Sequence, residues 1–128
     1  YEALRNKKYT CFLDKDTYLD MMYMSDALKA TVDLMEADPS RLKHRNAYNV
    51  TAESFNPEQL AREIIKYIPE FEMSYDVDPI RQAIANSWPN RLDDTAARED
   101  WGWSPDYDLE AMTKDMFEEL KIKLHISV

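Results

Sequence analysis

A single glycine, Gly102, in a chain of 128 residues is the feature that most restricts this sequence. Loops that cradle nucleotide phosphates use several glycines, because the backbone must turn tightly and approach the phosphate closely. One glycine cannot supply a G-x-G-x-x-G sequence or a P-loop. We therefore expect no cofactor-binding residue in this chain and no binding of a nucleotide by the chain alone.

Composition excludes several further classes of protein. The chain has 16 Lys and Arg residues and 25 Asp and Glu residues. The resulting net charge of −9 disfavours binding to nucleic acid or to anionic lipid. Hydrophobic residues make up 45% of the chain, which is enough to build a core. No apolar run is long enough to cross a membrane, and the single cysteine, Cys11, cannot form an internal disulfide. We expect a cytoplasmic location, with no nucleic-acid or membrane partner.

Apolar periodicity and turn residues predict strands that alternate with helices, which is typical of α/β or α+β architecture. Helices are expected to begin after Ser25, Asn56, Asp78, Asp94 and Asp108. Extended segments are expected at Tyr9–Leu13, Leu19–Met24, Ala47–Thr51 and Phe71–Asp76. The first residues, up to Arg5, have the pattern of a helix end, without a starting Met or a cap.

Capping residues give the most specific local predictions. Asn56, Pro57 and Gln59 fit a capping box with proline at the first helical position. Gly102 suits the left-handed position that follows a helix. The helix that we expect Ser25 to cap has one apolar face, made of Ala27, Leu28, Thr31, Val32 and Met35.

Metal-binding and nucleophilic patterns are weak. The pairs Asp14/Asp16 and Asp76/Asp78 lack the glycine and distal Glu of a calcium loop, and the two histidines have no ligand at i+3 or i+4. The methionines of 21–24 are soft copper ligands, but gap-filling explains them at least as well. We predict no metal site.

Catalytic patterns are weaker still. None of the eight tyrosines is followed four residues later by Lys, so the Tyr-x-x-x-Lys pair of short-chain dehydrogenases is absent. We predict no catalytic residue in this chain. Trp88 lies between a short helix and Pro89, where an aromatic side chain either lines a ligand pocket or simply packs.

An ordered series of short stretches resembles the C-terminal part of the L-threonine 3-dehydrogenases that have the extended short-chain dehydrogenase, or NAD-dependent epimerase/dehydratase, fold. The similarity runs from Tyr1 to about Leu120. Its stretches are YTCFL at 9–13, MMYMSDALKAT at 21–31, DLMEA at 33–37, YNVTA at 48–52, VDPIRQAIA at 77–85, SWP at 87–89 and WGW at 101–103. No single stretch is as specific as a catalytic signature, but the series is.

The resemblance implies a fold and a division of the chain. The chain would be roughly the last two-fifths of such an enzyme, because the family's Gly-rich loop and Tyr-x-x-x-Lys pair lie upstream. Residues of about 25–68 would accompany the Rossmann sheet, with Tyr48–Thr51 as its last strand. Residues of about 9–24 and 71–120 would form the smaller α+β substrate-binding lobe.

The resemblance also implies a function for the parent protein, namely oxidation of L-threonine at its 3-hydroxyl with NAD as the hydride acceptor. The Trp of Ser-Trp-Pro faces threonine in the family, which carries over to Trp88. Arg81 matches a substrate-binding candidate by position and could equally be a structural ion-pair partner. A sugar-nucleotide epimerase or dehydratase and a non-catalytic α/β binding module remain alternatives. We expect either a homo-oligomer or a self-associating fragment.

Overall fold

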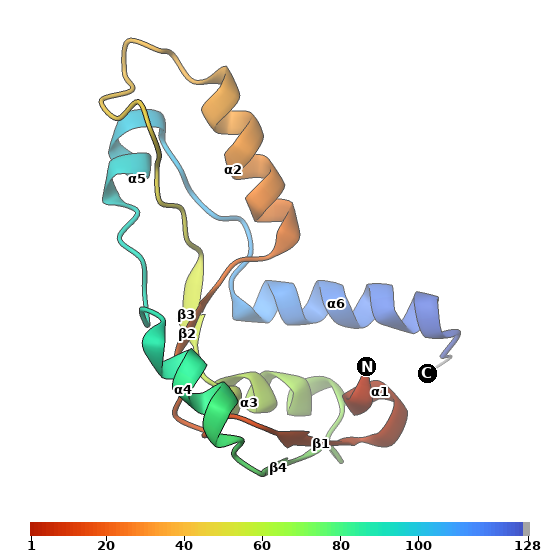
Figure 1. Ribbon diagram of the computed structural model, residues 1–128. Helices are drawn as coiled ribbons and strands as arrows, with labels where there is room; N and C mark the ends of the chain where they lie inside the picture. The colour runs from red at the N-terminus through yellow and green to blue at the C-terminus, as the bar shows by residue number, and fades with distance from the viewer. Residues whose placement is uncertain (127–128) are drawn as a thin grey trace.

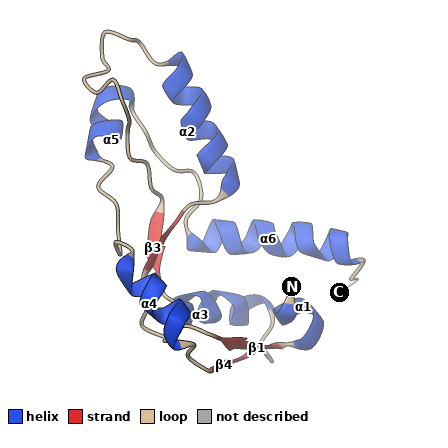
Figure 2. Cartoon of the chain, in the orientation of Figure 1, coloured by secondary structure: helices blue, strands red, loops and turns tan. Residues whose placement is uncertain are grey.

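The computed structural model describes residues 1–126, which contain six helices and four strands (Figures 1 and 2). In chain order these are α1 (Glu2–Asn6), β1 (Lys8–Cys11), β2 (Leu19–Met21), α2 (Met24–Glu36), β3 (Glu53–Phe55), α3 (Pro57–Tyr67), β4 (Glu72–Tyr75), α4 (Pro79–Ser87), α5 (Thr95–Trp101) and α6 (Leu109–Leu124). No helix of this part of the chain is long and apolar enough to cross a membrane.

The strands of residues 1–126 pair into two small sheets. β1 and β4 are parallel, and their register runs from Lys8 opposite Glu72 to Cys11 opposite Tyr75. β2 and β3 are antiparallel, and Asp20 lies opposite Ser54 in the middle of the pair. The α/β class expected from the sequence is thus confirmed.

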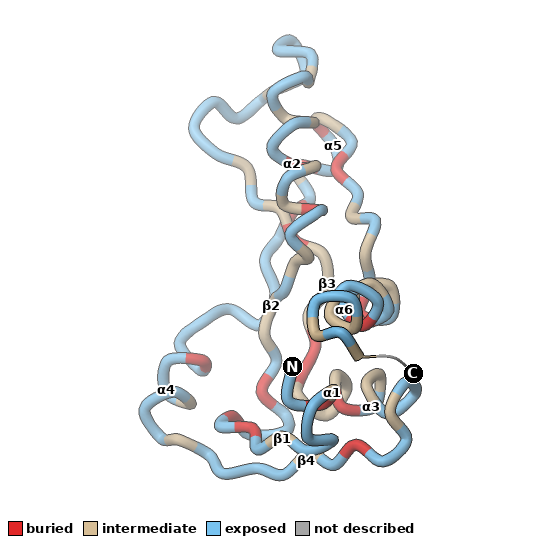
Figure 3. The backbone as a smooth tube through the Cα atoms, turned by 90° about the vertical axis from the view of Figure 1, so that its right-hand side faces the viewer, coloured by how far each residue is buried: buried red, intermediate tan, exposed pale blue. Residues whose placement is uncertain are grey.

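The elements form two arms that meet at the β2–β3 pair (Figure 1). One arm holds α2, α5 and the long loop 37–52, and the other holds α1, α3, α4, α6, β1 and β4. Burial is correspondingly thin, and the buried positions are scattered along the chain (Figure 3). Three small clusters form the core: Ala3, Ala61 and Phe71; Cys11, Leu13 and Ala85; and Ala30, Ala97 and Trp103.

The predicted helix ends are largely as expected. The Asn56 side chain accepts the backbone N–H of Gln59 at 2.8 Å, and the Gln59 side chain accepts the N–H of Asn56 at 3.0 Å, which completes the capping box. Asp78 and Asp108 accept first-turn N–H groups of α4 and α6. Gly102 ends α5 at φ +80°, a conformation that residues with a side chain rarely adopt.

The expected strand at Ala47–Thr51 is absent from the structure. A strand requires a neighbouring strand for its backbone hydrogen bonds, and residues 1–126 place none beside this segment. Its side chains pack on α2 and α5 instead: Tyr48 and Val50 lie against the cluster around Ala97, and the carbonyl of Thr51 accepts the indole N–H of Trp103 at 3.0 Å.

The expectation for the start of α2 was wrong. The helix begins at Met24 after Tyr23, so Ser25 is not its cap. Its buried positions are Asp26 and Ala30, whereas Leu28, Val32 and Met35 are 63%, 51% and 80% exposed. The apolar periodicity is present, but no sheet covers that face within residues 1–126.

A buried carboxylate fastens the long loop to α5. Asp100 accepts the Tyr48 hydroxyl at 2.8 Å and forms an ion pair with Lys43 at 2.9 Å. The hydrogen bond from Lys43, followed by that from Tyr48, lowers the pKa of Asp100. The carboxylate therefore stays ionised in the folded protein at a pH where it would be protonated in the unfolded chain. The stabilisation is complete above the unfolded pKa and is lost as the pH falls through the folded one.

Asp100→Asn should lower the melting temperature at neutral pH, because the Lys43 ammonium loses its counter-ion. It should also flatten the fall in melting temperature as the pH drops below about 4, the usual aspartate range. Thermal melts between pH 3 and 7 measure both effects. Glu36→Gln, at an exposed position of α2, is the control. Parallel pH profiles for Asp100→Asn and the unmutated chain would contradict the assignment.

The exposed face of α2 should drive association of the isolated 128-residue chain, since contiguous apolar patches favour contact between copies. Leu28→Glu with Val32→Glu is expected to shift the chain toward monomer in sedimentation velocity. Ile122→Glu removes an apolar side chain that is 70% exposed on α6 and serves as the matched control. An unmutated chain that is already a sharply melting monomer would refute this expectation.

Candidate substrate-binding site

Trp88 lies directly after α4, at the point where the chain leaves the helix. Its backbone N–H donates to the carbonyl of Ala85 at 3.2 Å, and its side chain is 58% exposed. Pro89 follows Trp88, and its ring fixes the backbone φ angle of residue 89, which restricts the path of the chain at this point. The indole thus stands at the surface on a defined backbone.

The inner side of α4 is well attached to the preceding segments. Ala85 is buried with Cys11 and Leu13. The Gln82 amide donates to the Thr17 hydroxyl at 2.9 Å and accepts the backbone N–H of Asp14 at 2.8 Å. The helix that carries Trp88 is therefore a rigid element on this side.

Arg81 lies two helical turns before Trp88 on α4. Its guanidinium carbon is 4.5 Å from the centre of the Phe12 ring, a cation–π distance. Its Nε is 3.6 Å from a carboxylate oxygen of Asp78. These contacts use the guanidinium to fasten α4 to residue 12, and they do not bring Arg81 to Trp88.

The outer side of α4 carries an apolar line that ends at Trp88. Ile80, Ile84 and Trp88 are spaced by four residues, so successive turns place them along one side of the helix. Their exposed fractions are 74%, 52% and 58%. This line is a surface on which a further part of the protein or a ligand could rest.

The segment after Trp88 is attached to the β2–β3 pair. The Ser54 hydroxyl donates to the carbonyl of Asn90 at 2.5 Å. The backbone N–H of Leu92 donates to Oδ2 of Asp20 at 2.8 Å, and Oδ1 of Asp20 accepts the Thr51 hydroxyl. Sequence reasoning missed Asp20 and Ser54, since no local pattern marks contacts made to residues 36 and 72 positions away.

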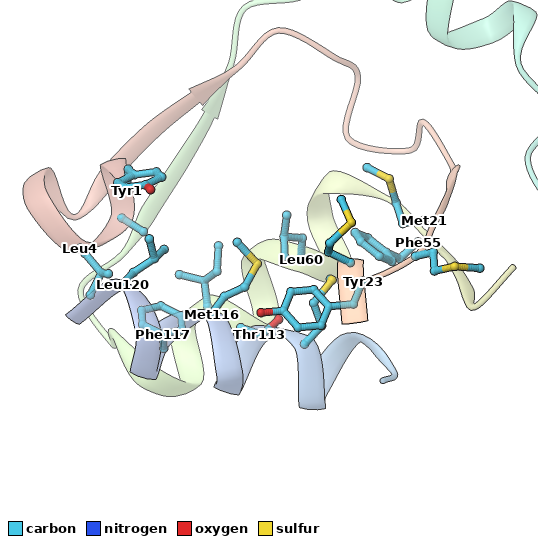
Figure 4. A pocket seen from close by; sticks show the side chains of 15 residues that line it. Tyr1, Leu4, Met21, Tyr23, Phe55, Leu60, Thr113, Met116, Phe117 and Leu120 are labelled. Carbon is cyan, nitrogen blue, oxygen red and sulfur yellow. The ribbon is translucent and has the colours of Figure 1, made fainter. Parts of the chain in front are cut away.

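A large apolar hollow lies elsewhere, between α1, α3 and α6 (Figure 4). It has a volume of about 500 Å³, and its walls are the side chains of Tyr1, Ala3, Leu4, Met21, Met22, Tyr23, Met24, Phe55, Leu60, Ile64, Met112, Thr113, Met116, Phe117 and Leu120. The walls offer no charged partner for an ammonium or a carboxylate. The charged groups of a zwitterionic amino acid would lose their hydration in this groove without gaining a polar partner. This groove is therefore not the candidate substrate site.

Tyr23, in the wall of that groove, has a hydrogen bond to a carboxylate. Its hydroxyl donates to Asp115 at 2.7 Å, and this hydrogen bond raises the pKa of Tyr23 to about 12. The phenol therefore stays protonated throughout the physiological range. It holds the start of α2 against α6, and the ring of Tyr107 packs on it at 4.8 Å between centroids.

A metal site in residues 1–126 would need side chains that can hold the ion, and a Gly-rich phosphate site would need a glycine placed to bind the phosphate. Residues 1–126 contain no cluster of three or more His, Cys, Asp or Glu side chains that could hold a metal ion. The single glycine sits at the C-terminal end of α5, where the helix dipole is negative. Gly-rich loops that bind a pyrophosphate lie at the N-terminal end of a helix, so Gly102 is not placed for that role.

Comparison with known proteins gives closely related sequences and structures. No family model matches the chain. It is 52% identical over 123 residues to an uncharacterized epimerase/dehydratase of Staphylococcus aureus (strain MRSA252), covering 96% of this chain and 38% of that protein. It superimposes on L-threonine dehydrogenase from Clostridium difficile with a TM-score of 0.92 at 55% identity, covering 95% of this chain and 38% of that one. L-threonine dehydrogenase from Phytophthora infestans gives a TM-score of 0.92 at 49% identity, covering 96% and 39%.

The chain matches the C-terminal part of proteins with the epimerase/dehydratase fold. It spans about two-fifths of the length of the relatives that it matches. An NAD-dependent NDP-hexosamine 5,6-dehydratase of tunicamycin biosynthesis has the same fold at 15% identity and a TM-score of 0.69, covering 94% of this chain and 38% of that one, which is a likeness of fold alone. The resemblance drawn from the sequence to the L-threonine dehydrogenases is confirmed.

The two residues singled out from the sequence have different surroundings in this structure. Trp88 is exposed at the end of a well-attached helix, as a side chain that meets a ligand should be. Arg81 is engaged by Phe12 and Asp78. Their roles toward a substrate stay predictions.

Proposed function

We propose that the whole protein oxidises L-threonine at its 3-hydroxyl with NAD as the hydride acceptor, and that this chain supplies the lobe that binds the substrate. The observation that carries the proposal is the 55% identity and the TM-score of 0.92 to L-threonine dehydrogenase from Clostridium difficile over 95% of the chain. The sugar-nucleotide alternative is favoured by the epimerase/dehydratase name of the uncharacterized relative at 52% identity, whereas the NDP-hexosamine dehydratase at 15% identity shows a likeness of fold alone. The non-catalytic alternative has no comparable support.

The proposed reaction divides the work between this chain and the rest of the protein. Oxidation of the alcohol removes a hydride from C3 of threonine and a proton from its hydroxyl. Neither the base nor the hydride acceptor's binding loop is part of this sequence, which lacks both the Tyr-x-x-x-Lys pair and the glycines. The contribution of this chain is to bind and orient threonine and to exclude water from it.

Trp88 is the residue that we assign to this task, as an apolar wall of the threonine site. Its exposure and the attachment of α4 support the assignment. We give Arg81 the lesser role of holding α4 in place, because its guanidinium already has two partners. The proposal keeps residues of about 25–68 with the Rossmann sheet and residues of about 9–24 and 71–120 in the lobe. A homo-oligomeric state and a cytoplasmic location belong to the same proposal.

In the whole enzyme, Trp88→Ala should lower kcat/KM for threonine by the equivalent of about 1–3 kcal/mol, the usual cost of losing one apolar wall. The affinity for NAD should be unchanged. Trp88→Phe keeps a ring at the site and is expected to retain most of the activity. Arg81→Ala should lower the melting temperature more than it changes threonine kinetics. An unchanged kcat/KM in Trp88→Ala would show that the indole has no contact with the substrate.

The 128-residue chain alone should not bind NAD at sub-millimolar concentrations, because it lacks the loop that holds the pyrophosphate. Isothermal titration calorimetry tests this, with the whole protein titrated in parallel as the positive control. Saturable binding by the isolated chain would show that phosphate-binding groups other than glycines are present.

A further inference from the structure

The middle residues of β2 and β3 form a matched pair. Asp20 lies directly opposite Ser54 in the antiparallel register. Opposed residues of two paired strands project their side chains from the same face of a sheet. The carboxylate of Asp20 and the hydroxyl of Ser54 therefore stand side by side on one face of this small sheet.

Both side chains contact the same short segment of backbone. The Ser54 hydroxyl donates to the carbonyl of Asn90 at 2.5 Å, and Oδ2 of Asp20 accepts the N–H of Leu92 at 2.8 Å. A bond from a backbone N–H to an ionised carboxylate is stronger than one between neutral groups. The pair thus grips one carbonyl and one N–H, two residues apart.

Packing does not hold this segment. Every residue from 86 to 93 is exposed, so buried apolar contacts contribute little to its position. Trp88 lies inside this stretch, with α4 on one side and the gripped backbone of 90–92 on the other. A single residue, Pro89, separates Trp88 from Asn90. The place of the indole therefore depends on α4 before it and on these hydrogen bonds after it.

We propose that Asp20 and Ser54 are positioning residues, which hold the backbone of 90–92 so that Trp88 stands at the threonine site. This inference rests on the proposed function, in which Trp88 is a wall of that site. It adds two residues that touch neither substrate nor cofactor in this arrangement and act through the backbone that follows Trp88.

Asp20 has a second contact that separates this role from a purely structural one. Its Oδ1 accepts the hydroxyl of Thr51, which is buried. Thr51→Val removes that hydroxyl and leaves the bond to Leu92 intact. Asp20→Asn can keep both contacts, with its oxygen accepting from Leu92 and its amide N–H donating to Thr51. Asp20→Ala loses both.

Hydrogen–deuterium exchange in the whole enzyme tests the grip itself. Asp20→Ala should speed exchange of the Leu92 amide at least tenfold, because that N–H loses its acceptor. Asp20→Asn and Thr51→Val should leave it within about twofold of the unmutated rate. Unchanged exchange in Asp20→Ala would overturn the proposal, and so would an equal increase in Thr51→Val.

Steady-state kinetics test the consequence for the substrate. Asp20→Ala should raise KM for threonine about tenfold, with kcat and KM for NAD within about twofold. Asp20→Asn should restore KM for threonine, and Ser54→Ala should raise it severalfold without changing exchange at Leu92. A fall in melting temperature with normal threonine KM, or an equal loss toward both substrates, would show a structural role only and refute the positioning role.

The two proposals fail in different ways. If Trp88→Ala raises KM for threonine but Asp20→Ala does not, the positioning role is wrong and the proposed function stands. If the whole protein does not oxidise threonine, the proposed function is wrong. The positioning role is then wrong as well, and the exchange data show only that Asp20 holds the backbone of Leu92.

Discussion

The most buried large side chain of the described residues is a carboxylate, Asp26, and the relation between the two arms depends on it. It is 1% exposed, and its two oxygens accept the backbone N–H groups of Asp106 and Tyr107 at 2.9 and 3.0 Å. A charge removed from water is costly unless hydrogen bonds replace the lost hydration. Nearby, the Lys29 ammonium donates to the carbonyl of Ser104 at 2.6 Å. Together these bonds fix the segment that leads into α6 against the first turns of α2.

Local signals in the sequence were sufficient to predict most helix ends. The Asn56 capping box, the caps at Asp78 and Asp108 and the left-handed Gly102 each depend on atoms within a few residues, so a short window contains all the information. The failed prediction at Ala47–Thr51 had equally good local signals. It failed because a strand exists only with a neighbour, which is a property of the whole sheet and not of five residues.

In the candidate site too, features with a local sequence signal were predicted and those that depend on distant residues were not. Trp88 was found through the resemblance of its surroundings to a family, and its exposure agrees with contact to a ligand. Asp20 and Ser54 have no such signal, because their partners lie 72 and 36 residues away and are backbone groups, which every residue has. The apolar face of α2 is a related case. Periodicity identifies an apolar side but does not say what covers it.

The parallel pairing of β1 with β4 has a consequence for how the chain folds. Thr10 lies opposite Ser74, so the pair closes only after the 63 residues between them have been made and brought back. Contacts of such long range cost loop entropy before they return any free energy, and they slow folding. On the ribosome, β1 emerges long before its partner and has an unpaired edge during that interval. The exposed charges of Lys8 and its neighbour Lys7 stand beside that edge and disfavour pairing with another nascent chain.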